Sequence, residues 1–138
     1  MSNMDSRNLA HVREIAQKID NISAGLVYYC EDCGEEITIP QDGELEADTC
    51  PHCGDQLTQM SFARYFDDHL GVEFRTNGKN HDINSVRVCI AYGGPSIYVD
   101  TADAKVKLYW WNDYAEAEFS TEARDEITEL FNEIWSYQ

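Results

Sequence analysis

Four of the five cysteines in this 138-residue chain form two pairs with the same internal spacing. Two residues separate Cys30 from Cys33, sixteen residues follow, and Cys50 and Cys53 repeat the two-residue gap. This gap lets both sulfurs of a pair reach one ion while the backbone amides turn towards the thiolates. Two such pairs complete a tetrahedral shell of four thiolates. The spacing therefore predicts one zinc ion, with a redox dithiol pair or an iron–sulfur centre as the alternatives.

A glycine follows each pair, Gly34 after the first and Gly54 after the second. Glycine tolerates the positive φ angle that so tight a turn tends to need. Because four cysteines leave no open coordination position, we expect the zinc to be structural, contributing on the order of 10 kcal/mol to folding. His52 is then expected to be an exposed spacer rather than a ligand. The fifth cysteine, Cys89, is expected to be a small buried apolar residue.

The segments around the cysteines must position them. The cysteine module, residues 26–58, is expected to contain a strand at 26–29 and a return strand at 37–39. Before it, apolar residues recur at helical spacing over 6–22, and Gly25 is a suitable end signal. We therefore expect an N-terminal packing helix that leads directly into the module.

Residues 59–138 have the pattern of a larger unit. A short helix is expected within 60–70, and the segment 72–111 reads as strands separated by turns, which predicts an antiparallel meander. An apolar stripe over 121–136 predicts a C-terminal helix on one face of that meander. The predicted fold class is α+β, organised as an N-terminal helix (1–25), a four-cysteine module (26–58) and an α+β domain (59–138).

The chain is strongly acidic, with 26 acidic residues against 10 basic ones and a formal net charge of −16. Such a chain is repelled by nucleic acid and by anionic membranes, and it is attracted to basic protein surfaces. The first residues lack the apolar stretch of a signal peptide, and no run approaches the ~18 apolar residues of a membrane span. Together with the metal-type cysteine pattern, these features predict a cytoplasmic protein without a membrane partner.

The segments Cys30–Gly34 (CEDCG) and Cys50–Gly54 (CPHCG) resemble the paired knuckles of the zinc-ribbon family, over residues 26–58. The resemblance implies metal binding and leaves the function open. Many zinc ribbons belong to nucleic-acid machinery and carry Lys and Arg on their loops. This module departs from that pattern, because ten acidic residues and no further Lys or Arg lie between Lys18 and Arg64. Since phosphate contact needs cations, we expect no direct binding of DNA or RNA.

Acidic residues gather in the cysteine module and in residues 113–138, where eight acids accompany one base. If the two segments lie side by side, they form one acidic surface. Rigidly spaced carboxylates can imitate duplex phosphates, and tryptophans among them can anchor a protein contact. The alternative is a solvated surface that keeps the protein soluble. The predicted contact residues are Glu31, Asp32, Glu35, Glu36, Asp42, Glu44, Glu46, Asp48, Trp110, Trp111, Asp113, Glu116 and Glu118.

Two of these residues, Trp110 and Trp111, end the last predicted strand. Since adjacent strand residues point to opposite faces, one tryptophan is expected to point outward. The run Cys89–Thr101 (CIAYGGPSIYVDT), with Tyr109-Trp110 and Tyr114-Ala115-Glu116, resembles small uncharacterised proteins of bacteriophages and mobile elements. Such elements often encode acidic inhibitors of host defence, including anti-CRISPR proteins and anti-restriction DNA mimics. The resemblance, over residues 70–136, implies a bacterial host cell as the setting and assigns no functional residue.

Arrangements typical of catalysis are not evident in the sequence. The Gly93-Gly94-Pro95 run lacks the Lys and Ser/Thr of a phosphate-binding loop, and the four histidines are scattered. We therefore expect an inhibitor rather than an enzyme, one that binds a basic surface of a Cas effector or a restriction nuclease and blocks nucleic-acid binding or cleavage. The alternative is an adaptor whose module docks on transcription or other host machinery. No sequence feature predicts an oligomeric state.

Overall fold

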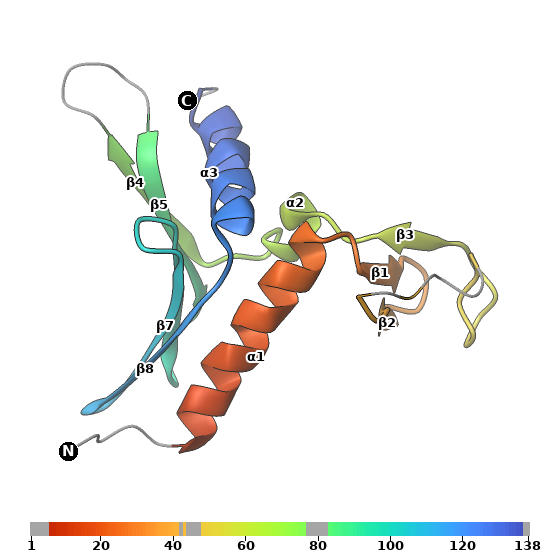
Figure 1. The fold of residues 1–138 in the computed structure, drawn as a ribbon, viewed down its shortest axis with the longest axis horizontal. Helices are drawn as coiled ribbons and strands as arrows, with labels where there is room; N and C mark the ends of the chain where they lie inside the picture. The colour runs from red at the N-terminus through yellow and green to blue at the C-terminus, as the bar shows by residue number, and fades with distance from the viewer. Residues whose placement is uncertain (1–5, 42, 44–47, 77–82, 137–138) are drawn as a thin grey trace.

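The computed structural model describes residues 6–41, 43, 48–76 and 83–136. Within these ranges the chain forms three helices, a three-stranded sheet and a five-stranded sheet, both antiparallel. The predicted α+β class is confirmed. In Figure 1 the first helix lies between the two sheets, with the small sheet on one side and the large sheet on the other.

Helix α1 (Ser6–Ser23) begins the described chain, and Val12, Ala16, Ile19 and Ile22 form its buried stripe. This stripe faces strands of the large sheet. The helix ends at the predicted glycine, because Gly25 adopts a φ angle of 77° and its N–H donates to the carbonyl of Ile22. The chain then turns directly into the cysteine module.

The large sheet has the strand order of a simple meander, β4-β5-β6-β7-β8. Its strands are β4 (Gly71–Thr76), β5 (Ile83–Ala91), β6 (Ser96–Asp100), β7 (Lys105–Trp110) and β8 (Asp113–Glu118). The last strand was not predicted, because the expected meander ended at residue 111. On β8 the buried position opposite Leu108 is occupied by Ala115, which gives only a weak apolar signal in the sequence.

Two helices cover one face of the large sheet. Helix α1 packs on β7 and β8, whereas α3 (Thr121–Ser136) packs on β5. The helix predicted within 60–70 is shorter than expected, since α2 spans only Phe62–Tyr65. The chain leaves α2 to join the sheet, where the N–H of Leu70 donates to the carbonyl of Cys89.

A buried carboxylate fixes the turn between β6 and β7. Asp100 is 2% exposed and accepts two hydrogen bonds from the Arg75 guanidinium, one from Lys107 and one from the N–H of Ala102. Burial favours the protonated form of Asp100, but the Ala102 N–H and then the two cations outweigh it and hold the pKa of Asp100 below its usual value. The carboxylate is therefore charged and stabilises this end of the sheet.

Replacing Asp100 with asparagine is expected to lower the free energy of unfolding by about 2 kcal/mol at pH 7. Because the folded pKa is depressed, the carboxylate stabilises the fold above its unfolded pKa of about 3.9, and this stabilisation is lost as the pH falls through the folded pKa. The difference between wild type and Asp100→Asn should thus shrink below about pH 4. Urea unfolding of both proteins from pH 7 to pH 3 tests this, and a constant difference would contradict it.

One hydrophobic core extends from the large sheet through α1 into the cysteine module. It includes Val27 and Tyr29 of the module and Met60, together with the buried residues of α1 and the sheet. A second, smaller cluster lies inside the module and includes Cys30, Cys50 and Leu57. The module is therefore attached to the rest of the protein by buried apolar contacts. Across the described residues, no helix combines the length and the apolar character needed to cross a membrane.

Candidate metal centre

A three-stranded sheet carries the cysteines. It consists of β1 (Val27–Cys30) between β2 (Glu36–Thr38) and β3 (Leu57–Gln59). The structure confirms the two predicted strands and adds β3, which has a single buried apolar residue, Leu57. Because β1 ends at Cys30 and pairs there with Leu57, it brings the first cysteine pair next to the segment that follows the second.

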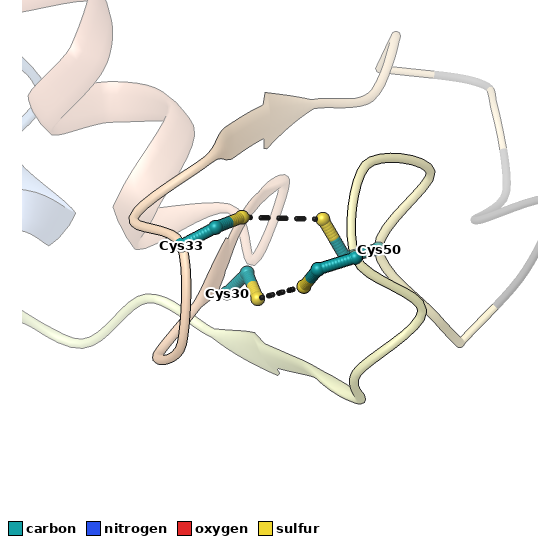
Figure 2. Close-up of side chains that lie close together, drawn as sticks. Cys30, Cys33 and Cys50 are labelled. Carbon is teal, nitrogen blue, oxygen red and sulfur yellow. Dashed lines mark hydrogen bonds between the residues drawn. The ribbon is translucent and has the colours of Figure 1, made fainter.

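The four predicted ligands converge from the two loops at one end of this sheet. The Sγ atoms of Cys30 and Cys53 lie 3.4 Å apart, and those of Cys33 and Cys50 lie 3.5 Å apart. Figure 2 shows Cys33 and Cys50 facing each other across the two loops. All four sulfur atoms lie within 4.8 Å of one another. The cysteines are therefore placed to hold one metal ion between them, as predicted.

The two loops have the same backbone structure. In the first, the N–H of Gly34 donates to the carbonyl of Cys30, and the N–H of Cys30 donates to the carbonyl of Glu35. In the second loop, the N–H of Gly54 donates to the carbonyl of Cys50, and the N–H of Cys50 donates to the carbonyl of Asp55. The two glycines have φ angles of 79° and 80°, the left-handed conformation expected for them. Each loop thus holds its pair of sulfurs by the same hydrogen bonds.

The thiols of Cys50 and Cys53 differ in how readily they ionise. Backbone N–H groups, first that of Cys53 and then that of His52, favour the Cys50 thiolate and lower the pKa of Cys50 to about 7. The N–H of Asp55 favours the Cys53 thiolate, but the Cys30 sulfur and the loss of water outweigh it and raise the pKa of Cys53 to about 12. A cation among the sulfurs favours all four thiolates, so metal binding displaces protons and weakens as the pH falls.

Two of the four cysteines are shielded from solvent and two are not. Cys30 and Cys50 are buried, whereas Cys33 and Cys53 are exposed. His52 is exposed, as predicted, and its Nε2 atom lies 3.7 Å from a carboxylate oxygen of Glu35. Around a tetrahedral ion, four sulfurs would occupy every coordination position, which is the arrangement of a structural metal site.

The predicted acidic contacts of the module lie on its surface. Glu31, Asp32, Glu36 and Asp48 are exposed, and Glu35 is half-buried. Glu36 forms an ion pair of 2.7 Å with Lys18 of α1, which the sequence analysis did not foresee. Three further predicted contacts, Asp42, Glu44 and Glu46, lie outside the described residues. The described acids of this set therefore lie at the surface of the module, and one of them, Glu36, is paired with α1.

The predicted contacts on the sheet fall into two groups. Trp110, Trp111 and Asp113 lie at the tip of the β7–β8 hairpin, which Figure 1 places at the opposite end of the molecule from the cysteine module. Glu116 is already engaged, because it accepts hydrogen bonds from the Tyr114 hydroxyl and from Lys105, which lower its pKa. Glu118 is exposed nearer the other end of β8. The structure therefore separates the tryptophans at the hairpin tip from the acids of the module.

The acidic C-terminal stretch meets the module at a cleft. This cleft has a volume of about 720 Å3. It is lined by residues 38–41 of the module, by Ser120 and Glu122 at the start of α3, and by the end of α1. Asp20 of α1 also lines the cleft and accepts a hydrogen bond of 2.7 Å from the N–H of Ser120. None of the described residues that line it is Lys or Arg. The module and the start of α3 thus face each other across this cleft, whose described acids are Asp20 and Glu122 rather than acids of the module.

Comparison with protein-family models, with curated proteins and with solved structures finds no match for this chain.

Proposed function

We propose that the four cysteines hold one structural zinc ion, and that the chain is an acidic binding protein which inhibits a nucleic-acid-targeting defence enzyme. A tetrahedral zinc ion with bonds of about 2.3 Å separates its sulfurs by about 3.8 Å. The observed separations of 3.4 and 3.5 Å, within a group no wider than 4.8 Å, fit such an ion. The resemblance of the two loops to zinc-ribbon knuckles supports the same assignment.

The charge of the module is the observation that carries the inhibitor proposal. Ten acidic residues and no further Lys or Arg lie between Lys18 and Arg64, and Lys18 itself is paired with Glu36. A module without cations cannot neutralise phosphates, so a basic protein surface is the partner that its charge fits. The target would be a Cas effector or a restriction nuclease in a bacterial host cell, whose nucleic-acid site the acidic surface would occupy.

The structure favours the module end of the molecule for this contact. Glu31, Asp32 and Asp48 of the module are exposed, and Asp20 and Glu122 add negative charge in the cleft between the module and α3. Zinc and the apolar contacts of Val27 and Tyr29 would hold these carboxylates on a rigid surface. Rigid spacing matters because a carboxylate pattern that is already ordered loses little conformational entropy when it binds.

Reversing the charge of three exposed acids in the module, Glu31→Lys, Asp32→Lys and Asp48→Lys, is expected to weaken inhibition more than tenfold. The reason is that these changes place repulsive charges against a basic partner. The measurement is inhibition of DNA binding and cleavage by a panel of Cas effectors and restriction enzymes. Wild-type inhibition should also fall as salt is raised from 0.1 to 0.5 M, because the attraction is screened.

A matched variant separates local charge from total charge. Glu14→Lys, Glu73→Lys and Glu129→Lys change the net charge by the same amount at exposed positions on α1, β4 and α3. This variant should keep most of the inhibition, and both variants should retain the bound metal. Absence of inhibition across the panel, or a tight salt-sensitive complex of the protein with bare DNA or RNA, would contradict the proposal. Capture of a polymerase subunit from host lysate would favour an adaptor instead.

A further inference from the structure

Aromatic side chains are exposed together at one end of the large sheet. Six large apolar side chains are exposed in the described part of the chain, and four of them are Tyr92, Tyr109, Trp110 and Trp111. Tyr92 lies in the β5–β6 turn and the others lie at the β7–β8 turn, which an antiparallel meander places at the same end (Figure 1). A Cβ on Gly94 would lie 3.9 Å from the Trp110 ring, so the two turns lie close together. These four residues are called the aromatic end.

The backbone of Trp111 is strained. Its φ angle is 55°, in a two-residue turn closed by the pair Trp110 and Asp113. Glycine, asparagine or aspartate usually occupies such a position, because a large side chain disfavours this conformation. The Trp111 side chain is 88% exposed, so burial within the chain does not offset the strain. A strained residue that presents its indole to solvent indicates a contact made outside the chain.

We infer that the aromatic end is a self-association surface, through which two copies of this chain form a symmetric dimer. Each copy has a net charge of −16, so a second copy is repelled by most of the surface. The segments 92–96 and 109–114 contain a single charged residue, Asp113. A contact between two aromatic ends also keeps the two acidic modules far apart, since each module lies at the opposite end of its own copy (Figure 1). This inference does not depend on the proposed function.

The exposed area suits a weak dimer. Aromatic side chains offer about 150–250 Å2 each, so the exposed fractions of 88% for Trp111, 75% for Tyr92 and 38% for Trp110 amount to roughly 400 Å2 per copy. Tyr109 is left out of this sum, because it precedes Trp110 on β7 and points to the opposite face, where its ring lies beside those of Tyr98 and Tyr114. Specific interfaces need about 1,000 Å2 in total, counting both partners. Two aromatic ends offer roughly 800 Å2, somewhat below that size, which predicts a weak dimer with a dissociation constant in the high micromolar range.

Other occupants fit the surface less well. A basic protein would find one carboxylate, Asp113, at the aromatic end and many more around the cysteine module. An anionic membrane would repel a chain of this charge. A symmetric contact between exposed rings needs neither a basic partner nor an anionic lipid, because each copy supplies the apolar surface that covers the other.

Sedimentation of the full zinc-loaded chain from 1 to 300 µM tests the inference. The mass should rise with concentration from the monomer value of 15.8 kDa towards twice that value. Added salt should strengthen association, because it screens the repulsion between two acidic copies. Trp111→Gly should weaken association at least tenfold and, at 1 µM, raise Tm by a few degrees, since glycine relieves the strained turn. Ile134→Ala, at an exposed apolar position on α3, is the matched control and should dimerise normally.

Four results would overturn the inference. They are a wild-type chain that stays monomeric at every concentration, a dimer that Trp111→Gly leaves unchanged, a dimer that salt weakens, and a Trp111→Gly variant whose Tm falls. A monomeric chain whose indole fluorescence shifts to shorter wavelength on phosphatidylcholine vesicles would assign the aromatic end to a lipid surface instead. A variant that still dimerises but no longer inhibits the nuclease would leave this inference intact and bear only on the proposed function.

Discussion

Replacing Cys50 with serine is expected to unfold the cysteine module while the large sheet and its helices stay folded. Cys50 is buried, and its sulfur lies 3.5 Å from that of Cys33, so its loss opens the four-thiolate shell. Structural zinc contributes on the order of 10 kcal/mol to the folding of small modules. The module's own apolar cluster is small, with Cys30, Cys50 and Leu57 as its buried members, and offers little to replace that contribution.

The measurements for this prediction are zinc affinity and amide NMR spectra. Zinc affinity should fall by more than about a hundredfold, because even the loss of an outer-shell partner costs 10–100-fold. Amide signals of the module should collapse to unfolded positions while those of the large sheet persist. Cys89→Ser is the matched control, because Cys89 lies on β5 outside the site, and this variant should bind zinc normally. A folded module in Cys50→Ser would show that the metal is dispensable.

The second large effect is expected from Phe131→Ala in α3. The Phe131 side chain is 1% exposed, and its ring lies edge-on to the rings of Phe66, His69 and Phe74 at centroid distances of 5.8, 5.7 and 6.5 Å. It therefore joins the C-terminal helix to β4 and to the segment after α2. Removing a buried phenylalanine costs about 3–5 kcal/mol through lost contacts and the cavity that remains.

Such a loss is a large part of the 5–15 kcal/mol that usually stabilises a domain. Urea unfolding followed by the circular dichroism of the helices measures it. Ile134→Ala changes an exposed residue of the same helix and should cost less than about 1 kcal/mol. Equal losses from the two variants would mean that Phe131 does not anchor α3 to the sheet.

The metal site could be predicted from the sequence because it depends on the geometry of short segments. The two-residue gaps fix which sulfurs lie together, and the glycines that follow them mark the turns. The long helices could also be predicted, since Ile19 in α1 and Ile127 in α3 belong to apolar stripes that continue over several turns. Local patterns of this kind need no knowledge of the partner against which they pack.

The features that the sequence did not reveal depend on contacts between distant segments. Strand β8 buries Ala115, whose small side chain hardly marks a strand, and it forms because β7 offers it a partner. Trp111 was assigned to a strand, but the structure places it in a turn with positive φ. Asn112-Asp113 next to it is a turn signal that competes with the strand pattern. The meeting of the module with α3 likewise depends on tertiary packing alone.

Zinc K-edge X-ray absorption of the purified chain, combined with its metal content, tests the central claim most directly. We expect one zinc ion per chain, surrounded by four sulfur atoms at about 2.3 Å. Iron in place of zinc, less than one zinc per chain, or nitrogen and oxygen in the first shell would contradict a closed site made by Cys30, Cys33, Cys50 and Cys53.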